Sequence, residues 1–375
     1  MNELINPGVV RSLERILAAA APGRSFPRLA AAAGHLDELS LRERTDLLSR
    51  AMLADLPGDY AGAAVIFRRA LEDPDFTGWM IWPATETAAT LALAGQEPVD
   101  FEDCLALLAE LTPRLTAEFA IRRLLAADLD RALAVIQGWT SHPDWQVRRL
   151  ASEGTRAYLP WAIRVPGITD RPAATLPILD ALYRDPVEDV RRSVANHLND
   201  LARHAPDEVV ATAARWLAAP DANTPRVVRH GLRTLLKKAH PGALKLLGFP
   251  PASLAVTPPR LDRTVVELPG ELAFDFEVSN IGPAEARLAV DYVVHYAKAN
   301  GTLAEKVFKL GTSVLGPGES RKFSKRHAFR QMTTRRHHAG AHLLELQVNG
   351  VRYAPTEFLV RTGNVQGHSG DLTGP

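Results

Sequence analysis

The chain has 375 residues, of which 46% are apolar and 23% charged, which is typical of a globular protein with two or three domains. The single cysteine excludes an intramolecular disulfide, and neither a signal segment nor an apolar run of membrane-spanning length is present, so we expect a cytoplasmic protein without membrane association. The net charge of +1 is unevenly distributed, because acidic side chains outnumber basic ones in residues 1–120 and the reverse holds in 121–250. This asymmetry favours an anionic partner for the middle of the chain.

Up to about residue 250 the apolar residues have helical spacing, with breaks at Pro, Gly and Asp clusters. The predicted helices of the first part are 8–20, 40–54, 59–72, 101–109, 114–126 and 128–139.

A repeat occurs in the second part of this region. A polar turn followed by Val and Arg occurs at Val147-Arg148-Arg149, Val190-Arg191-Arg192 and Val228-Arg229, at a spacing of about 40 residues. Such a period is typical of two-helix HEAT-type repeats, which stack into a solenoid with a concave face for an extended ligand. An unrelated helical bundle is the alternative, but it would not require the period.

The composition changes after residues 248–251, and from about 262 the sequence alternates between apolar and polar residues. Residues 272–278 and 288–296 have the period of two that is expected of half-buried strands, and Gly, Asn and Pro mark the turns between strands. Some seven strands in about 100 residues favour an all-β immunoglobulin-like sandwich. We therefore predict a helical-repeat domain at 1–257, a sandwich at 258–362 and a disordered, Gly-rich tail at 363–375.

Most enzyme signatures are missing, including a glycine-rich phosphate loop, a nucleophile elbow and a His-Glu-x-x-His pair. His338 and His342 would be one turn apart only on a helix, and they lie in the β region. We therefore expect neither a metal site nor another cofactor.

Two carboxylates and a tryptophan in the middle of the repeats are the remaining candidates for chemistry. Glu118 is expected near the start of the helix 114–126, Glu153 on a helix from 146 to about 158, and Trp161 just after that helix. A structural interpretation is also open: Glu118–Arg122 and Arg149–Glu153 have the spacing of surface salt bridges within a helix, and Trp161 could fill a repeat junction.

The stretch 142–161, together with Thr116-Ala-Glu-Phe-Ala-Ile-Arg, resembles the AlkC family of alkylation-repair DNA glycosylases, and the similarity covers nearly the whole helical region. That family is built of HEAT-like repeats, and a subset adds an immunoglobulin-like domain at the C-terminus. The resemblance implies excision of 3-methyladenine and 3-methylcytosine without flipping of the lesion into a deep pocket. It matches Glu118 and Glu153 to the catalytic carboxylates and Trp161 to the active-site aromatic residue.

These residue types suit that chemistry on physical grounds. A base methylated at N3 is cationic and leaves the deoxyribose readily, while positive charge develops on the sugar. Paired carboxylates stabilise this charge and orient the attacking water, and an indole face adds cation–π attraction. The expected enzyme is therefore a monofunctional glycosylase that hydrolyses the N-glycosidic bond and requires no acid to protonate the base.

Basic residues that recur in the repeats are candidates for binding double-stranded DNA. The first arginine of each pair is often a framework residue in HEAT repeats, so the second is the better candidate for a phosphate contact. A basic run at 321–338 of the sandwich contains no acidic residue and is a further candidate, although it is also compatible with a solvated face. The predicted DNA contacts are Arg148, Arg149, Arg191, Arg192, Arg229, Arg335 and Arg336.

Two other classes of function remain open at this point. A non-catalytic HEAT scaffold would bind protein partners through its concave face, and an inactive DNA-binding protein would bind DNA without releasing a base. The sequence has no coiled-coil heptads, so we expect a monomer.

Overall fold

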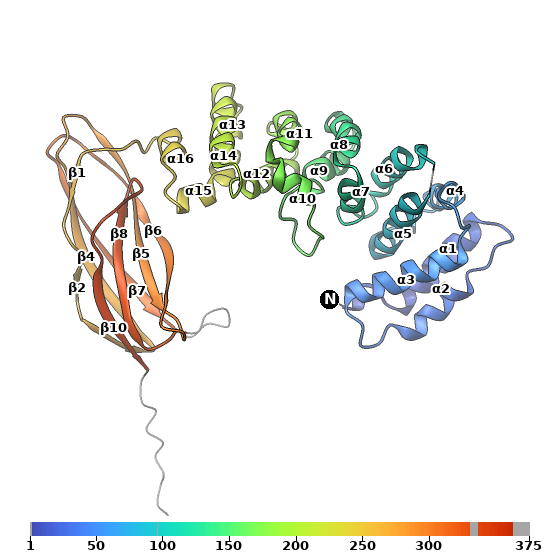
Figure 1. The fold of residues 1–375 in the computed structure, drawn as a ribbon, viewed down its shortest axis with the longest axis horizontal. Helices are drawn as coiled ribbons and strands as arrows, with labels where there is room; N and C mark the ends of the chain where they lie inside the picture. The colour runs from blue at the N-terminus through green and yellow to red at the C-terminus, as the bar shows by residue number, and fades with distance from the viewer. Residues whose placement is uncertain (1, 96, 331–336, 363–375) are drawn as a thin grey trace, which may run out of the picture. The chain divides into compact units, whose positions relative to one another are not determined.

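The computed structural model describes residues 2–95, 97–330 and 337–362. These fall into two compact units, 1–233 and 234–375, the first helical and the second dominated by β-strands (Figure 1). The predicted tail at 363–375 lies outside the described residues.

The helices of the first unit follow one another along the array, and each packs against neighbours that are near in sequence (Figure 1). Their bounds are α1 Pro7–Ala20, α2 Pro27–Ala32, α3 Leu41–Asp55, α4 Tyr60–Ala70, α5 Ile81–Ala94, α6 Val99–Leu111, α7 Ile121–Ala127, α8 Leu129–Gly138, α9 Trp145–Glu153, α10 Pro166–Asp170, α11 Leu176–Leu182, α12 Glu188–Leu201, α13 Pro206–Ala218 and α14 Thr224–Gly231. Two short helices follow in the chain, α15 Arg233–Lys237 and α16 Pro241–Leu246.

Local sequence explains where several of these helices begin. Ser40 and Glu43 form a reciprocal capping box at the start of α3, which satisfies backbone N–H groups that have no partner inside the helix. Asp144 accepts a hydrogen bond from the Gln146 backbone N–H at 2.7 Å and so begins α9. Five of the six predicted helices are confirmed as α1, α3, α4, α6 and α8, with small differences at their ends.

The predicted repeat is also confirmed, because its three Val-Arg signals fall on α9, α12 and α14. The valines Val147, Val190 and Val228 are fully buried, and α12 packs between α9 and α14. Each repeat therefore buries the apolar face at the start of its helix. It does so against the neighbouring repeat, as stacked helical repeats require.

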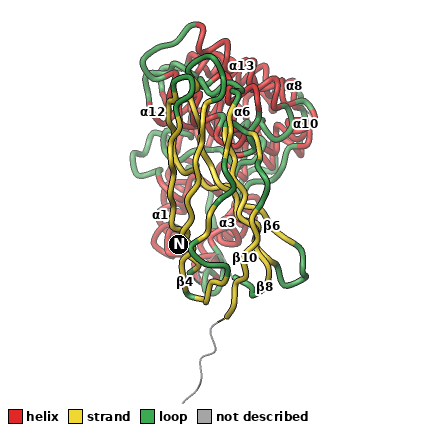
Figure 2. The backbone as a smooth tube through the Cα atoms, turned by 90° about the vertical axis from the view of Figure 1, so that its left-hand side faces the viewer, coloured by secondary structure: helices red, strands yellow, loops and turns green. Residues whose placement is uncertain are grey.

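The second unit is a β-sandwich whose long strands run side by side (Figure 2). In one sheet β4 pairs with β1, β2 and β7, and in the other the order is β3-β10-β8-β5-β6, with β9 paired to β8. The strand bounds are β1 Leu254–Val256, β2 Arg260–Leu261, β3 Val265–Leu268, β4 Gly270–Asn280, β5 Ala286–Ala297, β6 Leu303–Leu315, β7 Ser320–Phe329, β8 Gly340–Val348, β9 Val351–Arg352 and β10 Thr356–Thr362.

The two strands that the sequence predicts, 272–278 and 288–296, lie inside β4 and β5 and are confirmed. Alternate residues of both strands, such as Phe274, Phe276 and Tyr292, face the buried apolar core between the sheets. The predicted fold class, a helical solenoid followed by an all-β sandwich, is therefore confirmed.

Helix α16 packs in the same unit as the sandwich, although the sequence predicts that it belongs to the helical domain. The Asn349 side-chain amide donates hydrogen bonds to the Pro250 carbonyl at 2.9 Å and to the Arg287 carbonyl at 2.8 Å. Gly350 has a φ of +84°, and a Cβ there would lie 2.8 Å from Leu244, so only glycine permits this approach. Residue 257 thus remains the proposed boundary by composition, whereas by packing the division precedes α16.

Candidate active site

Glu118 lies in the turn that precedes α7, not on a helix. The prediction of a helix over 114–126 is wrong for its first half, because α7 begins only at Ile121. The Thr112 hydroxyl accepts a hydrogen bond from the Ala117 backbone N–H at 3.3 Å. This N–H thus has a partner in a turn and does not need one in a helix. The predicted Glu118–Arg122 pair within a helix is therefore not formed, and Arg122 points elsewhere.

Glu153 is the last residue of α9, so the prediction that this helix continues to about residue 158 is also wrong. A Cβ at Gly154 would lie 2.9 Å from the Ile121 side chain and 3.0 Å from the Leu150 carbonyl. The missing side chain lets α9 end tightly against α7, the helix that follows Glu118. This close approach brings the two carboxylates into one site.

Arg149 joins the two carboxylates. Its Nη1 lies 3.2 Å from Glu118 Oε2, and its Nη2 lies 3.9 Å from Glu153 Oε1. The predicted i,i+4 pair between Arg149 and Glu153 is thus present, but the same guanidinium also reaches across to the turn before α7. Arg149 is predicted as a DNA contact, and in this structure its partners are the two glutamates.

Glu153 is held in a buried charge network. Arg156 Nη1 lies 2.7 Å from Glu153 Oε1, and Arg156 Nε lies 2.9 Å from Asp200 Oδ2. Burial works to raise the pKa of Glu153, but Arg156, the Ser193 hydroxyl and Arg149 outweigh it, and the net shift is downward. Glu153 therefore remains ionised at neutral pH.

Glu118 shifts in the opposite direction. Burial raises the pKa of Glu118 above its ordinary value of 4.5, and the nearby charge of Glu153 adds to this, although Arg149 opposes both. Two carboxylates that share one arginine thus have pKa values displaced in opposite directions. Such a difference is typical of sites in which two acids have different roles.

Trp161 lies on an irregular segment that follows α9, residues 154–163. Its backbone has a φ of +59°, which is uncommon for a bulky residue, and 89% of its surface is exposed. The exposure excludes the alternative in which Trp161 fills a repeat junction in this structure. A large exposed indole on a strained backbone is a combination that functional sites often retain.

Arg122 fixes this segment, a role that the sequence did not predict. The side chain is buried, and it donates hydrogen bonds to the carbonyls of Ile163 at 2.6 Å, Gly154 at 3.0 Å and Arg156 at 2.7 Å. Burial lowers the pKa of the Arg122 guanidinium to about 10, so it is still a cation at neutral pH. A single buried cation therefore ties both ends of the segment that carries Trp161.

Glu118 and Trp161 line a common cavity of about 410 Å³ that we call the aromatic cleft. Its other rings are Trp79 on the approach to α5, Trp82 on α5 and Phe119 in the turn before α7. Trp82 and Phe119 stack with their centroids 4.8 Å apart. Trp79 and Trp82 are neighbours in sequence, but Phe119 and Trp161 come from distant segments, so no local pattern predicts the cleft.

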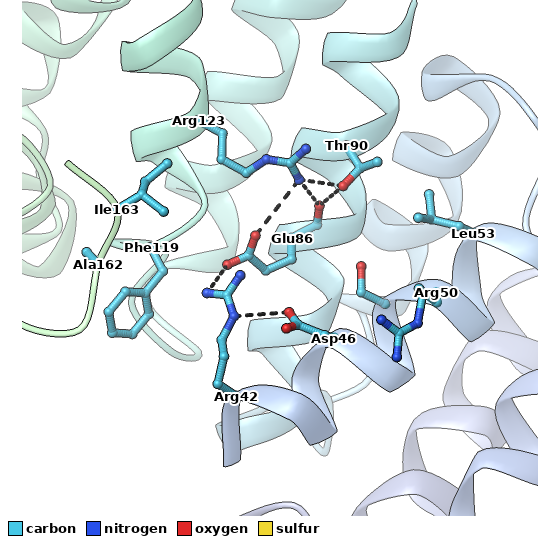
Figure 3. Close-up of a pocket in the computed structure, with 11 residues that line it drawn as sticks. Arg42, Asp46, Arg50, Leu53, Glu86, Thr90, Phe119, Arg123, Ala162 and Ile163 are labelled. Atoms are coloured by element: carbon cyan, nitrogen blue, oxygen red, sulfur yellow. Dashed lines mark hydrogen bonds and ion pairs between the residues drawn. The ribbon is translucent and has the colours of Figure 1, made fainter. Parts of the chain in front are cut away.

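A second cavity, of about 320 Å³, shares Arg42 and Phe119 with the aromatic cleft (Figure 3). Glu86 occupies its centre, where it pairs with Arg42 at 3.2 Å and lies 3.9 Å from Arg123 (Figure 3). Glu86 also accepts a hydrogen bond from the Trp82 indole N–H at 3.2 Å. This network holds Trp82, which stacks on Phe119, and the two rings form what we call the inner wall of the aromatic cleft.

The other predicted DNA contacts differ in how they are used. Arg148 pairs with Asp185 of the next repeat at 2.6 Å, and Arg191 hydrogen-bonds the Asp185 carbonyl in the turn before its own helix, so both are structural contacts of the repeats. Arg192 and Arg229 are exposed and remain predictions for phosphate contacts.

The basic run of the sandwich lies mainly on β7, where Arg321, Lys322, Lys325 and Arg326 are exposed. The hydrogen-bonded partner of β7 is β4, where ten residue pairs are in register from Gly270↔Phe329 to Ser279↔Ser320. Arg335 and Arg336 lie outside the described residues, so their prediction is not addressed by the structure.

Within residues 2–95, 97–330 and 337–362, no group of His, Cys, Asp and Glu side chains has the arrangement of a metal site. The same residues include no helix that is both long and apolar enough to span a membrane.

Fold and site together define a class of protein: a HEAT-like helical solenoid with a paired-carboxylate site, followed by an immunoglobulin-like sandwich. Residues 255–362 match the family model described as "Uncharacterised protein YhaZ, C-terminal Ig-like domain". The chain is 31% identical over 321 residues to the uncharacterized protein YhaZ of Bacillus subtilis (strain 168). The matched region covers 84% of this chain and 85% of that protein.

The chain is also similar to a solved structure, Pseudomonas fluorescens alkylpurine DNA glycosylase AlkC bound to DNA containing an abasic site analog. The TM-score is 0.78 and the identity 33%, with 96% of this chain and 99% of that chain covered. The chain therefore belongs to the AlkC family, to which its sequence was matched above, and has the fold of an alkylpurine DNA glycosylase.

Proposed function

We propose that the protein is a monofunctional DNA glycosylase that hydrolyses the N-glycosidic bond of cationic N3-methylated bases, namely 3-methyladenine and 3-methylcytosine. The observation that carries the proposal is the pair Glu118 and Glu153, joined by Arg149 and displaced in opposite pKa directions. Membership of the AlkC family supports the reaction class, and the AlkC structure with DNA supports DNA as the partner.

In this proposal the two carboxylates have different tasks. Glu153 stays ionised and stabilises the positive charge that develops on the deoxyribose as the base departs. Glu118 has the higher pKa, so it is the better proton acceptor for the water that attacks C1′. The cationic base leaves with the electrons of the broken bond and becomes neutral, so no acid is needed to protonate it.

Trp161 is placed to contact the substrate, because its indole is exposed and lines the same cleft as Glu118. An indole face stabilises a nearby cation, whether the methylated base or the sugar in the transition state. Arg122 acts as a positioning residue in this scheme, since it contacts only the backbone of the segment that carries Trp161.

Contacts to the DNA backbone are proposed for exposed cations on both units. On the solenoid these are Arg192 and Arg229, and on the sandwich they are the basic residues of β7. Such contacts position a protein on DNA without reading the base, so they should contribute equally to binding of damaged and undamaged duplex.

The direct test is to incubate duplex DNA containing 3-methyladenine or 3-methylcytosine with the protein and to quantify the free base. Wild-type protein should release the base, and Glu118→Gln and Glu153→Gln should each slow release on the order of 10²-fold while duplex binding is kept. Glu110→Gln is a matched control, because this exposed carboxylate pairs with Arg68 outside the site.

Two outcomes would contradict the proposal. A protein that binds the duplex but releases neither base would be a DNA-binding protein without glycosylase activity. A protein that shows no salt-sensitive DNA binding and releases no base would be a non-catalytic scaffold.

A further inference from the structure

The aromatic cleft has the size and chemistry of a small-molecule site. Its volume of about 410 Å³ falls within the roughly 300–1,000 Å³ of ligand pockets, and four of its ten lining residues are aromatic. The polar groups at its edge are few, with Glu118 and Arg42 as the charged ones. Pockets of this kind hold a planar apolar ligand and orient it by a small number of polar groups.

The inner wall of the cleft is held in place before any ligand arrives. Trp82 stacks on Phe119 at 4.8 Å, and its indole N–H donates to Glu86. The ring of Trp79 lies 6.0 Å from that of Trp82 at an angle of 54°. Because the rings are fixed by packing and hydrogen bonding, little side-chain entropy would be lost when a flat ligand stacks on them.

The outer wall is Trp161, which remains exposed although burial of an indole would be favourable. Its segment is anchored by Arg122, so the ring is presented to solvent by an ordered backbone. An exposed ring that faces a cleft with a prearranged aromatic wall points to a ligand that is itself aromatic.

The reaction proposed above supplies such a ligand next to the cleft. Glu118 lines the cleft and acts at the bond between sugar and base, so the base departs at its mouth. Departure with the bonding electrons converts the cationic base into a neutral, planar, methylated ring. A neutral ring is compatible with Arg42, whose guanidinium lies 5.6 Å from the centroid of the Trp82 ring.

We propose that the aromatic cleft binds the free N-methylated base after it has left the sugar, as a product site next to the catalytic carboxylates. This inference rests on the proposed function for the identity of the ligand. It goes beyond that function, because the cleft would retain the base and so make excision sensitive to product.

Equilibrium dialysis with radiolabelled 3-methyladenine, without DNA, tests this site directly. Wild-type protein should bind the base saturably with about one site per chain. Trp79→Leu and Trp161→Leu, which keep an apolar side chain but remove a ring, should each weaken binding on the order of 10-fold or more, as expected when one stacking partner is lost. Trp145→Leu is the matched control, since Trp145 is also partly exposed but does not line the cleft.

The result that would overturn the proposal is non-saturable uptake by wild type, or equal binding by all variants. Trp161→Leu guards against misfolding as an explanation, because an 89% exposed side chain adds little to stability. Excess duplex with an abasic-site analogue should leave the labelled base bound. Displacement by this duplex would mean instead that a base of the DNA occupies the cleft.

Dialysis requires no catalysis, so the outcome is independent of the glycosylase assay. Binding of the base without excision would contradict the proposed function and leave the cleft as a nucleobase site. Excision without binding would contradict this inference alone.

Discussion

Helices α9 and α12 open with the same sequence signal and are used differently at their other ends. In both, a polar turn is followed by Val and two arginines, and the first arginine contacts Asp185 in the turn before α12. Arg148 contacts the Asp185 carboxylate, and Arg191 contacts its carbonyl. This shared first half is the repeat framework.

The two helices differ in the contacts of the second arginine and in the residues of the turn that follows it. Arg149 reaches two carboxylates, whereas Arg192 pairs at 3.1 Å with the half-buried Asp189 of its own helix. In the register of the repeat, Asn196 occupies the position of Glu153, and His197 that of Gly154. Helix α12 continues to Leu201, while α9 ends at Glu153.

The continuous helix stabilises the interrupted one. His197 Nδ1–H donates to the Ser152 carbonyl at 3.0 Å, which is one of the last carbonyls of α9 and has no helical partner. Burial lowers the pKa of His197 to about 3, so the ring is neutral, and its proton is on Nδ1 because the Ser152 carbonyl can only accept. The repeat therefore provides the scaffold, and the departure from the repeat in α9 provides the site.

The largest expected effect is a difference in the free energy of unfolding between two Trp→Ala variants. Trp216 on α13 is buried, stacks on Tyr183 and donates to Asp180, so Trp216→Ala should lower the free energy of unfolding by about 3–5 kcal/mol. Trp161→Ala should change it by less than about 0.5 kcal/mol while lowering excision. Calorimetric melting of both variants measures the difference. A large loss for Trp161→Ala would restore the interpretation of Trp161 as a core residue.

A second change makes α9 resemble α12 at the position that distinguishes them. Glu153→Asn should reduce single-turnover excision on the order of 10²-fold, because it removes a charge that stabilises the sugar cation. Glu188→Gln, which removes a half-buried carboxylate from α12, should leave the rate unchanged. Equal rates for all three proteins would show that the two helices do not differ in function.

The smallest effect concerns the second arginine of α12. Arg192→Gln should lower the slope of log affinity against log salt by about one unit if Arg192 contacts a phosphate. Arg215→Gln on α13 is closely matched, since Arg192 and Arg215 each pair with an Asp and are 56% and 55% exposed. Binding titrations at several salt concentrations compare them. An identical slope for both variants would remove Arg192 from the DNA-binding surface.

Much of the fold follows from the sequence because its signals are local or periodic. The Val-Arg signals predict α9, α12 and α14, and alternation predicts β4 and β5. The ends of helices were harder to predict. Gly154 is compatible with a helix interior, and only its contact with Ile121 shows why α9 ends there.

The site was predicted only in part. Glu118, Glu153 and Trp161 were candidates from the sequence, the resemblance gave them their roles, and these roles remain predictions. Arg122 was read as a helical partner of Glu118, because its backbone contacts lie more than 30 residues away in sequence. Trp79 and Trp82 gave no signal, since their positions in α5 and before it are compatible with an ordinary core.

The most direct test of the account is the pH dependence of single-turnover release of 3-methyladenine, corrected for release without protein. Glu118 must be ionised to accept a proton, and burial raises its pKa above 4.5, so the rate should fall as the pH drops through that raised pKa and level off above it. Glu118→Gln should be slow and should lose this dependence, whereas Glu110→Gln should follow the wild-type profile. A Glu118→Gln protein that is as fast as wild type, with the same fall at low pH, would contradict the assignment of the two carboxylates.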